Sequence, residues 1–198
     1  MNKPQLILDA AGVLVANLSP DYWNGIHSLT GISYEKLKAL FKDELRSDFW
    51  SGKVPERRFW EWLQEKAPQI DIAAAQRLLM RELKPLAAMS HLASWSQWAD
   101  LHVLSNHRSE WLAPLLEPVS QYLKSVTISS SVGCCKPDPR IFNRVHTKLY
   151  ESAAIVYVDD QEKNRIPASQ LGWHTIIADP HEHWIEQVHF IISGTIPI

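Results

Sequence analysis

The segment Leu6-Ile7-Leu8-Asp9-Ala10-Ala11-Gly12-Val13 decides the fold of this chain. Its first three residues are apolar and predict a buried β-strand, and Asp9 follows directly where that strand ends. Open α/β sheets bind ligands outside the carboxyl ends of their strands, so a carboxylate here is a candidate nucleophile or metal ligand. Ala11, two residues further on, has no proton to give. The segment therefore predicts a catalytic strand that lacks half of an acid/base pair.

Five short apolar runs along the chain predict strands. They cover residues 5–8, 101–104, 125–128, 154–158 and 174–177. Turn residues or helical patterns, such as those over 140–149 and 161–171, separate the runs. This alternation is typical of βαβ units. We therefore expect an α/β fold with a doubly wound parallel sheet.

The first two predicted strands are separated by a long stretch whose apolar spacing is helical throughout. It is too long for an ordinary connection, in which a loop of roughly 2 to 6 residues leads into a helix. Ser33 is an acceptable cap for a helix from Tyr34, and Pro55 suits the first turn of another. We expect a four-helix-like cap domain over residues 16–86, inserted into a core of residues 1–15 and 87–198.

Composition excludes several classes of protein. The chain has 198 residues, 45% of them apolar, and its formal charge of −2 comes from 20 basic and 22 acidic residues that are interspersed. This gives no basic patch for nucleic acid or for an anionic membrane surface. No apolar run approaches the roughly 20 residues of a membrane helix, and the adjacent Cys134 and Cys135 fit reduced thiols. We expect a cytoplasmic protein.

The chain contains nine tryptophans, and five of them fall in the insertion or the helix just after it. Their main expected role is packing, because each buries a large apolar area with one polar group. Ligand sites favour domain interfaces and aromatic linings, so one or two of them, such as Trp23 or Trp50, are candidates for the wall of a substrate pocket.

Polar side chains follow the predicted strands one after another. They are Asp9 after the first strand, Ser105 and Asn106 after the second, Lys136 after the third, and Asp159 and Asp160 after the fourth. The carboxyl ends of parallel strands lie on one edge of a sheet, so these groups are expected to converge there. One such residue alone could be a helix cap or a turn. Because such a residue follows each of four successive predicted strands or lies in the loop after it, we interpret them together as one functional site.

With these residues in place, the chain resembles the haloacid dehalogenase (HAD) superfamily of hydrolases over most of its length. LILDAAGVLV is similar to the first motif of that family, LSNH to the second, the lysine of CCKPDPRIF to the third and VYVDDQEKN to the fourth. The insertion after the first motif resembles the helical C1-type cap of the family's first structural subclass. The resemblance implies a Rossmann-like core with this cap, which would open and close over the site.

The resemblance also implies roles for the candidate residues. Asp9 would be the nucleophile that takes up a phosphoryl group, and Ser105, Asn106 and Lys136 would hold the anion. Asp9, Asp159, Asp160 and the backbone carbonyl of Ala11 would bind Mg²⁺, which prefers oxygen ligands. The implied substrate is a small phosphorylated molecule, and the oligomeric state stays open.

Ala11 occupies the place where phosphatases of this family commonly have a second aspartate, which protonates the leaving group. General acid/base help of this kind contributes typically about 10²–10⁴-fold to the rate. One reading is a hydrolase with weakened acid/base catalysis, acting on leaving groups that need little protonation, such as those of sugar 1-phosphates, acyl phosphates or aryl phosphates. His107 is the first candidate for a substitute acid, ahead of His27 and His91.

Two further readings stay open. Carbon-phosphorus hydrolases of the family also have alanine at this place and use a cap lysine as a Schiff base, for which Lys36, Lys38, Lys42 and Lys53 are available. Carbon-halogen hydrolases also lack the second aspartate, but the pair Asp159 and Asp160 favours a metal. The other reading is a catalytically silent protein that binds metal and phosphate, and an engineered Asp-to-Ala substitution would give the same sequence.

Overall fold

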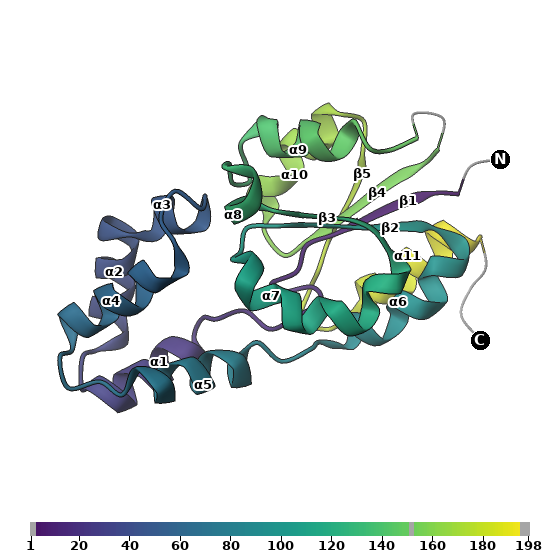
Figure 1. Ribbon diagram of the computed structural model, residues 1–198. Helices are drawn as coiled ribbons and strands as arrows, with labels where there is room; N and C mark the ends of the chain where they lie inside the picture. The colour runs from purple at the N-terminus through teal and green to yellow at the C-terminus, as the bar shows by residue number, and fades with distance from the viewer. Residues whose placement is uncertain (1–2, 151–152, 195–198) are drawn as a thin grey trace.

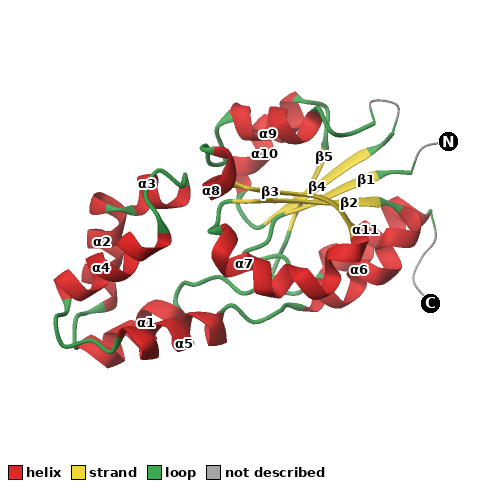
Figure 2. Ribbon diagram, in the orientation of Figure 1, coloured by secondary structure: helices red, strands yellow, loops and turns green. Residues whose placement is uncertain are grey.

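The core of the protein is a sheet of five parallel strands in the order β3-β2-β1-β4-β5 (Figure 2). The computed structural model describes residues 3–150 and 153–194, so residues 1–2 and 195–198 of the predicted core lie outside this range, as do 151–152. The strands are β1 (Gln5–Leu8), β2 (Asp100–Ser105), β3 (Leu123–Ile128), β4 (Ile155–Asp159) and β5 (His174–Ile177). The predicted α/β fold with a parallel sheet is confirmed.

Helices cover both faces of the sheet, which makes it doubly wound (Figure 1). One face carries α6 (Ala87–Trp98), α7 (Ser109–Leu116) and α11 (His183–Ser193), and the other carries α8 (Ser129–Val132), α9 (Pro139–His146) and α10 (Arg165–Gln170). Two short 3₁₀ helices, η1 (Glu117–Tyr122) and η2 (Glu162–Asn164), complete the described core. The strand order and the two helical layers are those of a Rossmann-like core.

Strand β1 is the central strand and is buried on both sides. Leu6 and Leu8 pack into the apolar cluster on one face of the sheet, and Ile7 packs into the cluster on the other. Leu8 lies in register with Val103 of β2 and with Val158 of β4. The residue that follows β1, Asp9, is therefore held between two neighbouring strand ends and is only 3% exposed.

The stretch between β1 and α6 is helical, as the sequence predicts. Within residues 16–86, all of which the structure describes, it forms α1 (Asp21–Thr30), α2 (Tyr34–Glu44), α3 (Arg46–Trp50), α4 (Glu56–Lys66) and α5 (Ile72–Glu82). The structure has one helix more than the expected four-helix-like arrangement, because it also contains α3, a helix of only five residues. Ser33 caps α2 by accepting a hydrogen bond from the Lys36 backbone N–H, as expected. We refer to α1 to α5 as the cap.

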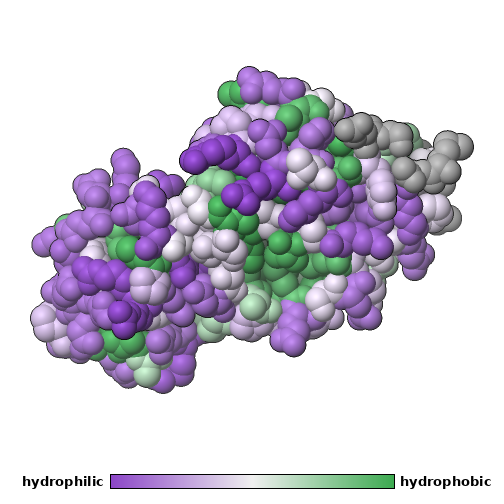
Figure 3. Space-filling view, turned by 45° about the horizontal axis from the view of Figure 1, so that its top comes forward, coloured by the Kyte–Doolittle hydropathy of each residue, from purple (hydrophilic) through white to green (hydrophobic). Residues whose placement is uncertain are grey.

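Aromatic residues form the interior of the cap. The ring centroid of Phe41 lies 5.3 Å from that of Trp23, 5.7 Å from that of Phe59 and 5.8 Å from that of Trp62. Such tilted and edge-to-face pairs stabilise a core beyond the area that they bury. Hydrophilic residues dominate the visible surface of the cap, whereas a hydrophobic area lies on the core (Figure 3). These tryptophans therefore have the packing role that the sequence predicts.

The tip of the cap docks on the core beside the carboxyl ends of the strands. The buried Arg108 guanidinium donates hydrogen bonds to the backbone carbonyls of Phe49 (3.0 Å) and Val54 (2.9 Å). The Ser129 hydroxyl donates to the Trp50 carbonyl at 2.6 Å. Gly52 fits because a Cβ there would lie only 1.9 Å from the carbonyl oxygen of Ser130. These contacts place the cap over the edge of the sheet where the candidate residues lie.

No helix among the described residues has both the length and the apolar character needed to cross a lipid bilayer.

Candidate active site

Lys136 is the centre of a buried charge cluster at the carboxyl ends of the strands. Its ammonium lies 2.8 Å from Asp9 Oδ2 and 2.6 Å from Asp159 Oδ2, and it donates a hydrogen bond to the Leu104 carbonyl at 3.0 Å. All three charged side chains are at most 4% exposed. The fold thus brings together the residue that follows β1, the last residue of β4 and a lysine from the loop before α9.

Asp159 is held by more donors than Asp9. Its oxygens accept hydrogen bonds from Asn164 Nδ2 (2.9 and 3.0 Å), the Gln161 backbone N–H (2.8 Å) and the Tyr157 hydroxyl, in addition to Lys136. Burial alone would raise the pKa of Asp159, but the Lys136 ammonium and these donors hold it below its usual value. Asp159 is therefore an ionised carboxylate that fixes the position of Lys136.

Asp9 is in a different electrostatic environment although it shares the same ammonium. Burial raises the pKa of Asp9 to about 7, against the lowering effect of Lys136, and the neighbouring Asp159 charge raises it further. Apart from Lys136, the described donor to its carboxylate is the Ala10 backbone N–H, 2.7 Å from Oδ1. A carboxylate with few hydrogen bonds in a buried site is suited to react or to bind a cation.

The donor set at this edge fits a divalent cation that prefers oxygen. Carboxylate oxygens of Asp9, Asp159 and Asp160 lie within 4.8 Å of one another. Asp160 Oδ1 is buried and has no hydrogen-bond partner, while its Oδ2 accepts from Asn17 Nδ2 at 3.0 Å. A buried carboxylate oxygen without a partner is costly unless a ligand compensates it. Because the oxygens of Asp159 are already engaged, Asp9 and Asp160 are the freer ligands.

Ser105 ends β2 and Asn106 follows it, but the two side chains differ in what they contact. The Ser105 hydroxyl is fully buried and has no hydrogen-bond partner, so it is free to bind an added group. The Asn106 amide donates to the Lys136 carbonyl (2.8 Å) and accepts from the Lys136 backbone N–H (2.7 Å). Asn106 thus fixes the main chain of Lys136, and the expected contact with phosphate stays a prediction.

His107 lies in the site as a neutral side chain. It is 2% exposed and packs against Trp50 and Trp111, with ring centroids 5.4 and 5.9 Å apart. Burial lowers the pKa of His107 to about 4, so at neutral pH the imidazole has no surplus proton to give. A neutral imidazole is a poor candidate for the substitute acid. That role of His107 stays an untested prediction.

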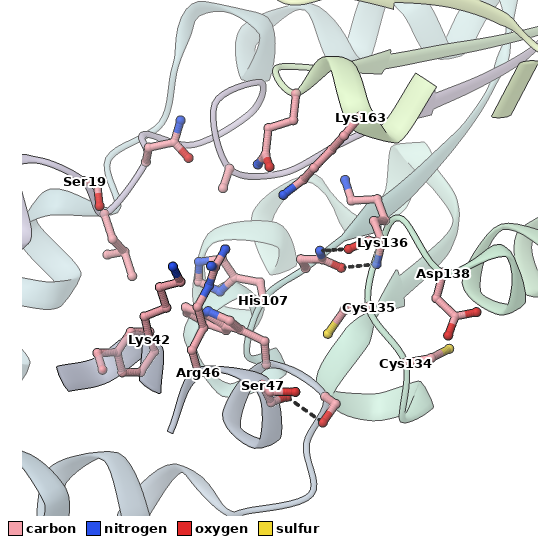
Figure 4. Close-up of a pocket in the computed structure, with 18 of the residues that line it drawn as sticks. Ser19, Lys42, Arg46, Ser47, His107, Cys134, Cys135, Lys136, Asp138 and Lys163 are labelled. Carbon is pink, nitrogen blue, oxygen red and sulfur yellow. Dashed lines mark hydrogen bonds between the residues drawn. The ribbon is translucent and has the colours of Figure 1, made fainter. Parts of the chain in front are cut away.

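A cleft of about 1040 Å³ lies between the cap and the core. Its lining includes Ala11, Trp23 and Trp50, and Figure 4 shows part of it. The two tryptophans proposed as pocket walls therefore line it while they also pack in the cap. His27 and His91 do not belong to this lining; His27 Nδ1 lies 2.9 Å from the Ile32 carbonyl, and His91 stacks on Trp95.

Several residues that support the site were not predicted from the sequence. Asn17 holds Asp160, Tyr157 and Asn164 hold Asp159, and Arg108 docks the cap. Two of these carry a sequence signal. Tyr157 precedes Asp159 by two residues on a strand, which puts both on the same side of the sheet, and Asn164 lies five residues after Asp159 in the same segment, VYVDDQEKN. The contacts of Asn17 and Arg108 join distant segments and have no local pattern.

Comparison of the sequence with protein-family models and with curated proteins gives no match. Solved structures do share the fold. A HAD family enzyme from Bacteroides thetaiotaomicron is 18% identical and superposes with a TM-score of 0.80 over 93% of this chain and 97% of its own. A predicted HAD-like family hydrolase from Porphyromonas gingivalis, also 18% identical, gives 0.79 over 96% and 98%.

A third structure, the L-2-haloacid dehalogenase from Xanthobacter autotrophicus, is 16% identical and has a TM-score of 0.62 over 100% of this chain and 85% of its own. At such low identities these likenesses establish the architecture of the chain. The protein has the fold of HAD-family hydrolases.

Proposed function

We propose that this protein is a magnesium-dependent phosphatase that acts on a small phosphorylated metabolite in the cytoplasm through an aspartyl-phosphate at Asp9. The observation that carries this proposal is the buried cluster in which Lys136 lies 2.8 Å from Asp9 while carboxylate oxygens of Asp9, Asp159 and Asp160 lie within 4.8 Å. An ammonium beside a carboxylate, next to a cation site, is an arrangement that can accept a phosphoryl group.

The reaction has two steps, each centred on Asp9. In the first, an Asp9 oxygen forms a bond to phosphorus while the bond from phosphorus to the leaving oxygen breaks. In the second, a water oxygen bonds to phosphorus and gives up a proton to solvent, the bond to Asp9 breaks with its electron pair returning to the carboxylate, and inorganic phosphate leaves. Lys136 and the free Ser105 hydroxyl would bind the phosphoryl oxygens in both steps.

Asp9, Asp160, Asp159 and the carbonyl of Ala11 would hold the magnesium ion. When bound, the ion would supply positive charge that offsets the repulsion between the Asp9 carboxylate and the phosphate. One finding on a structural neighbour supports this proposal: the Bacteroides enzyme was crystallised with magnesium and inorganic phosphate, both as the wild type and as an aspartate-to-alanine mutant. Loss of one aspartate in that protein is thus compatible with both ligands.

Ala11 limits the leaving groups that the proposed enzyme would accept. Its methyl group lines the cleft and cannot protonate a leaving oxygen. We therefore expect turnover of phosphates whose leaving groups need little protonation, such as aryl phosphates and sugar 1-phosphates, and slow turnover of alkyl phosphates.

The test is a phosphate-release screen on purified protein with magnesium, with and without a chelator. Three chains are compared: the natural one, Asp9→Asn and Ala11→Asp. We expect release that needs magnesium and Asp9, and a gain of about 10²–10⁴-fold on alkyl phosphates in Ala11→Asp. Asp9→Asn is nearly isosteric, and its unfolding curve serves as the control for folding.

The opposite result would be no release by the natural chain from any phosphate of the panel, with activity only in Ala11→Asp. That outcome would reject the phosphatase and favour a catalytically silent protein that binds metal and phosphate.

A further inference from the structure

The cap presents a row of basic side chains to the cleft. Lys38 and Lys42, four residues apart, share one face of α2, and Arg46 begins α3 directly after Leu45; all three line the cleft. On the opposite side of the cleft, η2 of the core contributes Lys163. In Figure 4 the ends of Lys42, Arg46 and Lys163 point into the same open space.

Three of these cations have no partner among the residues that the structure describes. In residues 3–150 and 153–194, no hydrogen bond or ion pair engages the side chains of Lys42, Arg46 or Lys163. The other basic side chains of the lining are engaged: Lys38 donates to the Tyr34 hydroxyl, Lys53 pairs with Asp48, Arg140 pairs with Asp138, and Lys136 pairs with Asp9 and Asp159. The three free cations are therefore available to a ligand.

This concentration of positive charge does not follow from composition, because the whole chain has a formal charge of −2. The acidic residues of the same lining are Asp138, which Arg140 already engages, and Asp160, which belongs to the candidate cation site. A cleft lined by one sign of charge attracts and orients ligands of the opposite sign. No acidic residue of the described cap belongs to this lining.

We propose that Lys42, Arg46 and Lys163 bind a second anionic group of the substrate, a phosphate or a carboxylate, remote from the phosphoryl group that Asp9 attacks. This inference rests on the proposed function and names its substrate class: a phosphomonoester with two anionic ends. Arginine binds such groups through two parallel hydrogen bonds, and lysine adds a point charge. The cleft volume of about 1040 Å³ has room for a molecule larger than phosphate alone.

Three substrates on one sugar skeleton test this subsite. Glucose 1-phosphate has one anionic group, glucuronic acid 1-phosphate adds a carboxylate at the far end, and glucose 1,6-bisphosphate adds a phosphate there. The Lys42→Ala/Arg46→Ala chain is compared with the natural chain and with Lys36→Ala/Arg57→Ala. The control removes the same charge from the cap, but Lys36 and Arg57 are exposed and lie outside the cleft.

We expect the cleft variant to lose about tenfold or more in kcat/KM for whichever two-anion substrate the natural chain prefers, the size of one charge-assisted hydrogen bond. The loss for glucose 1-phosphate should stay below about twofold, and the control should resemble the natural chain. Preference for the carboxylate or the phosphate tells which second group is bound. Equal losses on all three substrates, or no preference for a second charge, would overturn the proposal.

A binding measurement separates this inference from the proposed function. Titration calorimetry with the same three sugars is run on Asp9→Asn, with and without the two cap substitutions, so no turnover is needed. A two-anion sugar should bind more tightly than glucose 1-phosphate, and the cap substitutions should abolish this difference. That result supports the subsite even if the natural chain releases no phosphate. Absence of phosphate release with such binding would reject the phosphatase and keep the subsite; binding that ignores the second charge would reject the subsite.

Discussion

The two walls of the cleft hold positive charge in opposite ways. On the core side, Lys136 is about 1% exposed and lies between two carboxylates. On the cap side, Lys42 and Arg46 are exposed and unpaired within the described chain. A buried charge needs an oppositely charged partner within the protein, because its desolvation is costly. An exposed charge is solvated by water and stays available to bind a ligand. In the function that we propose, the core wall would carry the chemistry and the cap wall would recognise the substrate.

The largest difference between the two walls is expected when the charge is removed from each of them. Lys136→Met leaves Asp9 and Asp159 buried beside each other without a cation, so we expect a loss of about 3–5 kcal/mol in the free energy of unfolding. Lys42→Met, with the same change of side chain, should alter it by at most about 0.5 kcal/mol. Urea unfolding at pH 7 measures both. Similar values for the two variants would contradict the division into a structural and a ligand-binding charge.

A third kind of polar side chain, buried and uncharged, lies in the core at His102. His102 Nε2 lies 3.0 Å from Gln5 Oε1, and Nδ1 lies 2.8 Å from Ser125 Oγ. The Gln5 amide nitrogen donates to the Lys3 carbonyl, so its oxygen faces His102 and accepts from Nε2–H. Burial lowers the pKa of His102 to about 4. The ring is therefore a neutral member of the core at pH 7.

The pH dependence follows from this shift. The unfolded chain takes up a proton on His102 below about pH 6.5, and the folded chain only near pH 4, so acid favours unfolding. The contribution of His102 to stability is complete above about pH 6.5 and falls by up to about 3 kcal/mol towards pH 4. Unfolding curves from pH 7 to 4 should show a shallower fall for His102→Gln than for the natural chain. Parallel curves would mean that His102 does not titrate in this way.

A smaller effect tests how Asp159 is held. Tyr157→Phe removes the hydroxyl that donates to Asp159, and we expect it to cost about 1–2 kcal/mol of stability, because the acceptor is charged but keeps its other donors. Tyr122→Phe is the matched control, since no described hydrogen bond engages that hydroxyl. Both are measured by thermal unfolding at pH 7. An equal effect of the two substitutions would show that this hydrogen bond does not contribute.

The sequence predicts the strands better than their ends. The expected bounds for β1 and β5 agree with the structure, whereas β3 begins at Leu123 instead of residue 125. The alternation of apolar residues indicates a strand, but its first residue depends on the neighbouring strand with which it pairs. Leu123 pairs with Leu101 of β2, next to a shift in register that no local pattern announces.

Convergence of the site was predictable because it follows from topology alone. Once the sheet is parallel, Asp9, Ser105 and Asp159 must end at the same edge. What the sequence leaves open is which of these groups the protein itself satisfies. The amide of Asn106 contacts the main chain of Lys136, a partner 30 residues away, so a role in holding the loop was not visible.

In the cap, too, the sequence predicts the local structure but not the contacts of its side chains. The spacing of Lys38 and Lys42 puts them on one face of a helix, and Arg46 begins the next helix, but the sequence does not tell whether these side chains meet water or the cleft. Packing of the aromatic interior and docking of the loop after α3 by Arg108 decide this orientation. Lys36, two residues before Lys38 on the same helix, lies outside the cleft lining.

Chemical trapping at Asp9 tests the central claim most directly. The protein is mixed with magnesium and an aryl phosphate, quenched during turnover, and reduced with borohydride, which converts an aspartyl-phosphate into homoserine. Peptide mass spectrometry then locates the change. The account predicts homoserine at position 9, dependent on substrate and absent from Asp9→Asn. Phosphate release that proceeds with position 9 unmodified, or with the modification at another residue, would contradict it.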